Sequence, residues 1–198
     1  MLYITVRSRL KQAGLLLGIS LLCTMLGIAA RYSLLGARVE PGPLPSDVIV
    51  VLAGEPTRDR YATALVAQGV APRVLSTLVD PQCVRAGRLP QVCASGVRST
   101  VDEALLMHTE LAAERVQQVT VVTSNYHTLR AAVIFRIVFI GSGIQVSMVA
   151  PPGPPPDSRN IISEVKKFFP SVGAAIIGRL SPALYQRIAQ QFRGETRL

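Results

Sequence analysis

An uncharged hydrophobic segment near the N-terminus sets the first limit on what this 198-residue chain can fold into. Residues 13–30 read AGLLLGISLLCTMLGIAA and contain no charged side chain. As an α-helix, this segment would span about 27 Å, close to the roughly 30 Å of hydrocarbon in a bilayer. We therefore predict one N-terminal transmembrane helix over residues 13–30.

Basic residues flank this segment unevenly, and their distribution predicts its orientation. Three of them precede it (Arg7, Arg9 and Lys11), and two follow it at wider spacing (Arg31 and Arg38). Because the denser basic flank usually stays in the cytoplasm, the rest of the chain should face the other side. The sequence predicts a single-pass protein of the inner (plasma) membrane with a cytoplasmic N-terminus and a periplasmic or extracellular domain.

A cleaved secretory signal is the alternative, since small residues at Gly27, Ala29 and Ala30 would suit a cleavage site. We prefer retention, because the apolar run is longer than the usual 7–15 residues of a signal core. Both interpretations export the domain.

The net charge of +9 lies at the two ends of the chain. Residues 1–38 hold five basic and no acidic residues, residues 151–198 hold seven and three, and residues 39–150 hold nine of each. A nucleic-acid-binding domain normally carries its basic excess on the folded body. The pattern favours a membrane partner and disfavours nucleic acid.

Periodicity predicts an α/β domain over residues 47–150. Short β-branched runs, expected as buried strands, alternate with stretches of helical spacing. The expected strands are 47–53, 73–78, 119–124 and 144–150, and the expected helices are 58–68, 99–115 and 126–135. This alternation is typical of a Rossmann-like, three-layer domain with a mostly parallel sheet.

The remaining segments are predicted from composition. They are a basic cytoplasmic flank (1–12), a linker (31–46) and a Pro-rich spacer followed by a C-terminal helical segment (151–198). In the last of these, we expect residues 160–169 to pack on the body and expect breaks at Pro170 and Pro182. Packing on the body or lying on the membrane surface both fit the rest.

Two cysteines bracket the loop CVRAGRLPQVC. Cys83 and Cys93 would be able to pair in an oxidising compartment, and two free thiols are the alternative. No metal site is predicted, because a second cysteine pair is missing and the histidines are His108 and His127 alone.

The most informative segment for function is VVTSNYHTLRAA. A predicted strand runs into Thr123 and Ser124, and a predicted helix then carries His127 and Arg130 on one face. A helix N-terminus with an imidazole and a guanidinium would form an anion-binding corner, and His127 would be able to act as a general acid or base. Alternatively, Ser124 only caps the helix and Arg130 pairs with a surface carboxylate.

Two further segments should reach the same edge of the sheet. In RSTVDEAL, Ser99 and Asp102 have the spacing of a capping box, whereas Thr100 and Glu103 are left unexplained by it. Glu103 would orient the imidazole or a ligand hydroxyl, unless it is only a favourable charge in the first helical turn.

The third segment, LAGEPTRDR, is a strand-to-helix turn with Gly54 at the bend. Arg58 would meet an anion there or be solvated at the helix start. The segment lacks the glycine patterns of dinucleotide-binding and ATP-hydrolysing proteins, and no nucleophile-elbow motif occurs in the chain.

Taken in order, these segments resemble the bacterial YdcF/SanA/ElyC-like envelope family, a domain of unknown function. The matching sequences are DVIVVLAG, an R-x-x-x-A-x-x-L-x-x-x-G stretch that begins at Arg58, STVDEA and VTSNYHTLRA, within residues 47–150. The chain departs from the family at 53–55, where many relatives have successive glycines, and Glu55 would repel a phosphate there.

The resemblance implies a Rossmann-like fold and a role in peptidoglycan or lipid-carrier metabolism, with no established reaction or cofactor. The positions that carry over are Gly54, Arg58, Thr100, Glu103, Thr123, Ser124, His127 and Arg130. With His127 and Glu103 as catalytic groups, the domain would bind or process an anionic small molecule or envelope precursor. A non-catalytic envelope scaffold is the alternative, and S-adenosylmethionine binding, associated with a cytoplasmic member of the family, is a further one.

Overall fold

The computed structural model describes residues 44–195 and, within the hydrophobic segment, residues 16, 18, 20, 23–25 and 27. The basic flank, most of the predicted anchor over 13–30 and the linker up to residue 43 lie outside the described residues. Where the chain is described, no helix is long and apolar enough to cross a membrane.

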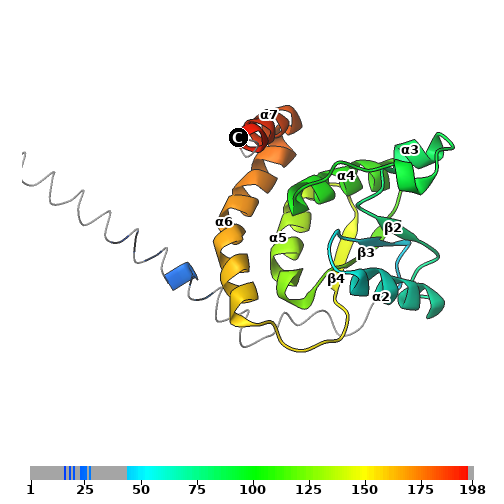
Figure 1. Cartoon of the computed structure of the whole chain (residues 1–198), viewed down its shortest axis with the longest axis horizontal. Helices are drawn as coiled ribbons and strands as arrows, with labels where there is room; N and C mark the ends of the chain where they lie inside the picture. Colours follow the sequence, from blue (N-terminus) through cyan, green and yellow to red (C-terminus); the bar gives the residue numbers. More distant parts are fainter. Residues whose placement is uncertain are drawn as a thin grey trace, which may run out of the picture.

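The chain forms an α/β domain around a four-stranded, all-parallel sheet (Figure 1). The strands lie in the order β2-β1-β3-β4. Their bounds are Val48–Val51 for β1, Val74–Ser76 for β2, Gln118–Val122 for β3 and Gln145–Val149 for β4. The predicted alternation of strands and helices is confirmed, although each strand is shorter than expected.

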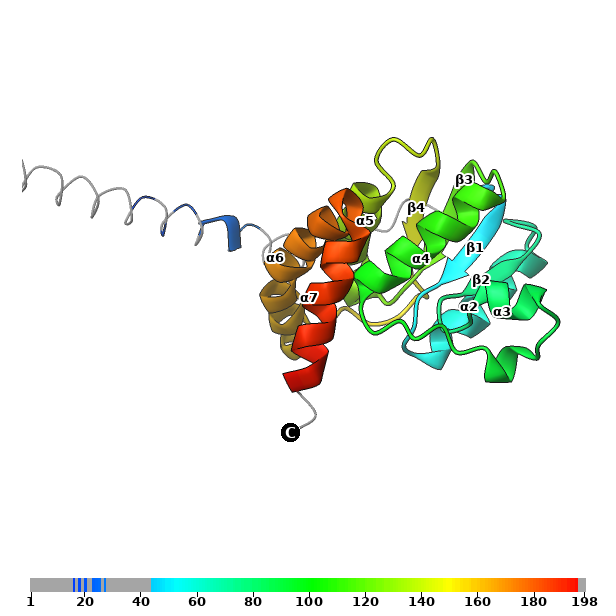
Figure 2. The ribbon, with the colours of Figure 1, turned by 90° about the horizontal axis from the view of Figure 1, so that it is seen from above.

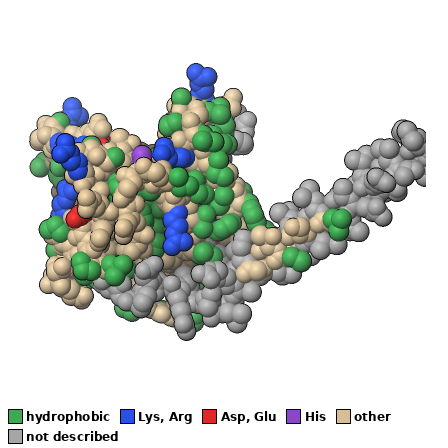
Figure 3. Space-filling view, turned by 180° about the vertical axis from the view of Figure 1, so that it is seen from behind, with side chains coloured by type: hydrophobic (Ala, Val, Ile, Leu, Met, Phe, Trp, Pro, Cys, Tyr) green, Lys and Arg blue, Asp and Glu red, His purple; other side chains and the backbone are tan. Residues whose placement is uncertain are grey.

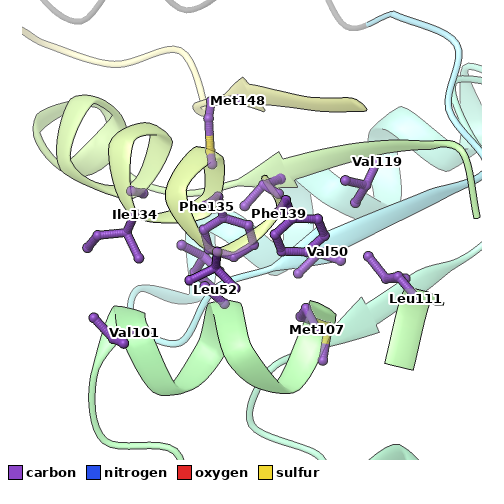
Figure 4. Packing of buried hydrophobic residues seen from close by; sticks show 14 of the residues in the cluster. Val50, Leu52, Val101, Met107, Leu111, Val119, Ile134, Phe135, Phe139 and Met148 are labelled. Carbon is purple, nitrogen blue, oxygen red and sulfur yellow. The ribbon is translucent and has the colours of Figure 1, made fainter. Parts of the chain in front are cut away.

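Helices cover both faces of the sheet because alternate residues of a strand point to opposite sides. Val48, Val50 and Leu52 pack in one core with α4 (Thr100–Ala113) and α5 (Thr128–Val138), where Phe135 and Met107 fill the centre (Figure 4). Ile49 and Val51 face α2 (Pro56–Ala67) in a second core. Strands buried on both faces explain the continuous apolar runs in the sequence.

Two C-terminal helices lie outside α4 and α5. Helix α6 (Ser158–Leu180) packs on α5 and α4, and α7 (Pro182–Glu195) packs beside α6 (Figure 2). The Tyr185 hydroxyl, on α7, donates a hydrogen bond of 2.9 Å to Asp102 on α4. The predicted packing of residues 160–169 is confirmed.

The predicted break at Pro170 is wrong, whereas the break before Pro182 is present. Pro170 lies inside α6 with its side chain exposed. A proline in a helix interior loses one backbone hydrogen bond, and tertiary packing of the helix offsets that loss here. Helix α6 ends at Leu180, Ser181 is its C-cap, and Pro182 begins α7, a position at which proline is favoured.

The loop between β2 and α4 contains short helices that were not predicted. They are α3 (Pro81–Arg85) and the 3₁₀ turn η1 (Pro90–Val92). Cys83 and Cys93 form a disulfide within this loop, and the Cys93 side chain is buried. Of the two possibilities left open by the sequence, the structure has the disulfide.

Candidate functional site

The predicted site residues lie at the end of the sheet where the parallel strands finish. Two groups of side chains lie there, and they differ in how many of their polar atoms have a hydrogen-bond partner. We call the first the edge group, which consists of Gly54, Arg58, Glu103, Thr123 and Ser124. We call the second the closed cluster, which consists of Thr100, His127, Arg130 and Glu164.

Arg58 holds together the ends of β1 and β3. Its guanidinium is buried, and Nε donates a hydrogen bond of 3.0 Å to Oγ of Ser124. Nη1 donates to the carbonyl oxygens of Leu52, at 3.2 Å, and of Ala53. The alternative of a solvated arginine at the helix start therefore does not hold.

Gly54 is exposed and lies directly over this guanidinium. Its φ is +146°, and a Cβ added here would stand 2.6 Å from Nη1 of Arg58 and 2.9 Å from Nη2. Both the backbone conformation and the close approach require glycine. Without a side chain at Gly54, the guanidinium edge lies just beneath the surface.

Glu103 accepts its hydrogen bonds through one oxygen. The backbone N–H of Ala53 and the Thr77 hydroxyl both donate to Oε1, each at 2.7 Å. Oε2 accepts no hydrogen bond from the described residues. Burial raises the pKa of Glu103 above its ordinary value, although these two hydrogen bonds and the nearby charges of Arg58 and Arg130 oppose the shift.

Glu103 and Arg58 both form hydrogen bonds with the backbone of Ala53. The N–H of Ala53 points to the carboxylate, and the carbonyl of Ala53 accepts from the guanidinium. Within the described residues, Arg58 forms no ion pair with a carboxylate, which is unusual for a buried cation. Within the described residues, no hydrogen bond joins Glu103 to His127, whose ring nitrogens face Thr100 and Glu164 instead. Glu103 therefore does not orient the imidazole, and its expected role toward a ligand hydroxyl stays a prediction.

Thr123 adds an unused polar atom to the edge group. Its hydroxyl oxygen is, among the described residues, the only side-chain polar atom that is completely shielded from solvent and has no hydrogen-bond partner. The Thr123 N–H still pairs with the carbonyl of Val149, so the residue continues the alternation of β3. By that alternation, Thr123 faces the side of the sheet covered by α4 and α5.

The closed cluster is organised around Glu164, which sequence reasoning missed. Arg130 binds its carboxylate with two nitrogens, from Nε to Oε2 at 2.7 Å and from Nη2 to Oε1 at 2.9 Å. Nδ1 of His127 lies 3.1 Å from Oε2. The anion-binding site predicted at His127 and Arg130 is thus occupied by the carboxylate of Glu164, a residue of the same chain.

Thr100 completes this cluster on the other side of the imidazole. Its hydroxyl lies 3.1 Å from Nε2 of His127, and Nη1 of Arg130 donates to it at 3.4 Å. Nδ1 of His127 lies 3.1 Å from Oε2 of Glu164 and 3.0 Å from Nη2 of Arg130, and it can form only one of these two hydrogen bonds. In the tautomer in which Nδ1–H donates to Glu164, Thr100 donates to Nε2. A neutral imidazole then links a hydroxyl to a carboxylate, the order of groups found in hydrolytic triads.

The charges of the cluster stabilise each other. Burial would raise the pKa of Glu164, but hydrogen bonds from His127 and Arg130 outweigh it and lower the pKa from 4.5 to about 2. Burial lowers the pKa of His127, although the bond to Glu164 opposes the shift. All four side chains are at least nine-tenths buried, so the triad-like order is enclosed.

A pocket of about 410 Å³ opens beside the edge group. The turn after β1, the turn after β3 and the Pro-rich segment after β4 form its walls. Ser124, Asn125 and Tyr126 line it, and the Tyr126 hydroxyl donates to Glu55 at 3.0 Å across the entrance. Its charged wall residues are Glu55 and Asp157, so the pocket itself favours hydroxyl groups over phosphate.

The described residues contain no group of three or more His, Cys, Asp or Glu side chains placed to hold a metal ion. Comparisons with models of protein families, with curated proteins and with solved structures found no match for the chain.

Proposed function

We propose that this chain is a membrane-anchored, exported domain of the YdcF/SanA/ElyC-like type, with a Rossmann-like fold, that binds an anionic ligand of the cell envelope. The ligand would lie at the carboxyl ends of β1 and β3, against the edge group. The predicted anchor and the basic flanks support the location, and the disulfide fits an oxidising compartment.

The position of the edge group supports a binding site. In the order β2-β1-β3-β4, the connection after β1 runs to β2 at one edge of the sheet, and the connection after β3 runs to β4 at the opposite edge. In open parallel sheets, such a switch between neighbouring strands leaves a crevice at their carboxyl ends, where ligands bind. The pocket beside Ser124 lies at this place.

The observation that carries the proposal is the unpaired charge of Arg58. Its Nη2 donates no hydrogen bond within the described part of the chain, and it lies under the exposed Gly54. The carboxylate of Glu103 accepts from the Ala53 N–H and the Thr77 hydroxyl and forms no ion pair with this guanidinium. An anionic group at Gly54 would therefore find two N–H donors of a cation that has no carboxylate partner within the described residues, while hydroxyls of the same ligand would suit the pocket.

Calorimetry on the full chain in detergent tests this proposal, with inorganic phosphate and a short-chain polyprenyl phosphate as probes. Arg58→Met should weaken binding by at least about tenfold, because it removes hydrogen bonds to a charged group. Arg60→Met, an exposed arginine on the same helix, is the matched control and should bind as the parent does. Equal binding by the parent and Arg58→Met would overturn the proposal.

A nitrogen-detected NMR titration with phosphate covers the case in which Arg58→Met does not fold. The Arg58 guanidinium resonances of the parent protein should shift more than those of Arg60. No shift at millimolar phosphate would count against an anionic ligand at this site. Reporter fusions at the C-terminus test the location separately, since an active cytoplasmic reporter would contradict export.

A non-catalytic scaffold is the second candidate, and the enclosure of His127 favours it over an enzyme. The pocket lining does not include His127. Full complementation of a deletion strain by His127→Gln, with normal protein abundance, would support binding or scaffolding. Loss of function in a folded, abundant His127→Gln protein would favour catalysis.

A further inference from the structure

The outward face of α6 carries an apolar stripe that the domain leaves uncovered. Ile162, Phe169 and Ile176 recur every seven residues, and Leu180 continues the line. Ile162, Ile176 and Leu180 are 54%, 44% and 80% exposed. At helical spacing, this face is opposite the residues of α6 that are buried, namely Glu164, Ala175 and Gly178.

The stripe is long. From Ile162 to Leu180 it covers about 27 Å of helix at 1.5 Å per residue. Leu184, near the start of α7, is a further exposed apolar residue, with 48% of its surface accessible. Single exposed apolar residues are common, whereas an aligned row of this length marks an interaction surface.

Cations accompany the apolar residues. Between residues 157 and 191, the exposed charged side chains are one acid, Asp157, and five bases, Arg159, Lys166, Lys167, Arg179 and Arg187. Glu164 lies in the same span but is buried in the closed cluster. Figure 3 shows hydrophobic side chains interspersed with Lys and Arg on the lobe that α6 and α7 form.

We infer that this face of α6 and α7 lies on the surface of an anionic membrane. An apolar row flanked by Lys and Arg is the composition of helices that lie in the lipid interface. Each cation near an anionic leaflet favours the bound state by roughly fivefold. A second copy of the chain is a poorer occupant, because a two-fold contact would bring the same five cations together.

This inference does not depend on a ligand at the edge group. It gives the basic C-terminal segment a role separate from the pocket and would hold the domain at the lipid surface. If the predicted N-terminal anchor is retained, the domain has two membrane attachments. The site at the sheet edge would then be kept at a fixed height above the lipid headgroups.

The absence of Trp from the chain makes a direct test possible, since a single introduced Trp is the only indole. Leu180→Trp and the control Leu89→Trp place it at exposed positions on α6 and in the disulfide loop. The full-length variants are reconstituted into vesicles of brominated phosphatidylcholine, with or without an equimolar amount of phosphatidylglycerol. Leu180→Trp should be quenched in the mixed vesicles and Leu89→Trp should not.

Charge reversal in the Leu180→Trp variant distinguishes charge-dependent binding of α6 to the lipid surface from mere nearness of the domain to the membrane. Arg159→Glu/Lys166→Glu should shift the docked population by at least about 25-fold, at roughly fivefold for each cation removed. Arg60→Glu/Arg88→Glu makes the same change in net charge on exposed residues elsewhere and should keep the quenching. An unquenched Leu180→Trp in mixed vesicles would overturn the inference, and so would quenching that is unchanged by reversal at Arg159 and Lys166.

Discussion

The edge group and the closed cluster lie at the same end of the sheet but differ in how their buried charges are compensated. In the closed cluster, Arg130 binds Glu164 with two nitrogens, and His127 and Thr100 use the remaining atoms. In the edge group, Arg58 and Glu103 are buried without an ion pair among the described residues. Of the residues that the sequence assigned to one site, those of the closed cluster therefore bind one another, whereas those of the edge group keep polar atoms without a partner in the described part of the chain.

The largest effect should come from removing the carboxylate of the closed cluster. Glu164→Ala leaves the charge of Arg130 buried without its carboxylate, so we expect the free energy of unfolding to fall by about 3–5 kcal/mol. Arg73→Ala breaks the exposed ion pair with Glu114 and should cost less than about 1 kcal/mol. Urea unfolding followed by circular dichroism measures both, and similar losses would mean that Glu164 is not a structural centre.

Lowering the pH should reduce the contribution of the closed cluster to folding stability and increase that of the edge group. The pKa of Glu164 falls from 4.5 to about 2 on folding, so its contribution, present above pH 4.5, is lost as pH falls toward about 2. The lowered pKa of His127 also makes acid unfavourable, beginning below its ordinary value of 6.5, whereas the raised pKa of Glu103 makes acid favourable.

Unfolding at a series of pH values checks these signs. The stability difference between the parent and Glu164→Gln should shrink below pH 4.5, because the unfolded parent takes up a proton there while the folded parent keeps its carboxylate until about pH 2. A difference that stays constant from neutral pH to about 2 would show that the charge of Glu164 does not stabilise the cluster.

Gly54→Ala should have an intermediate effect on stability and a large one on the edge group. The positive φ and the displaced Arg58 guanidinium together should lower the free energy of unfolding by about 2–3 kcal/mol. Gly96→Ala has a positive φ but no atom within 4 Å of the added Cβ, so it isolates the backbone strain, about 1 kcal/mol. Equal losses in the two variants would mean that Arg58 moves aside freely.

Glu103→Gln should change stability least. The introduced amide retains an oxygen for the Ala53 N–H and the Thr77 hydroxyl and removes a buried charge, so the variant should lie within about 1 kcal/mol of the parent. Because the pKa of Glu103 is raised, any advantage of the variant at neutral pH should shrink as pH falls toward 4.5. A marked loss of stability would contradict a burial penalty at Glu103.

Much of the fold follows from local pattern, whereas the site depends on contacts distant in sequence. The β-branched runs predicted the strands, and Thr100 and His127 were placed at the right helix starts. Glu164 could not be assigned a partner, because 34 residues separate it from Arg130. One signal was present: a lone carboxylate stands in an apolar stretch of a segment that was expected to pack.

The contact between Gly54 and Arg58 also could not be predicted from local sequence. The sequence indicated a bend and a cation, but not that the guanidinium occupies the space of the missing Cβ. Pro170 was misjudged because local preference predicts a break, and the packing of α6 on the body outweighs that preference. These errors arise where tertiary contacts override or complete a local pattern.

The ion pair between Arg130 and Glu164 also has a consequence for the order in which the chain can fold. The four strands and α5 are complete by residue 149, whereas Glu164 comes later in the chain. During synthesis, the charge of Arg130 therefore cannot be enclosed until the last helices have been added. A chain truncated after Pro156 would retain every strand and still stop at a partly hydrated intermediate.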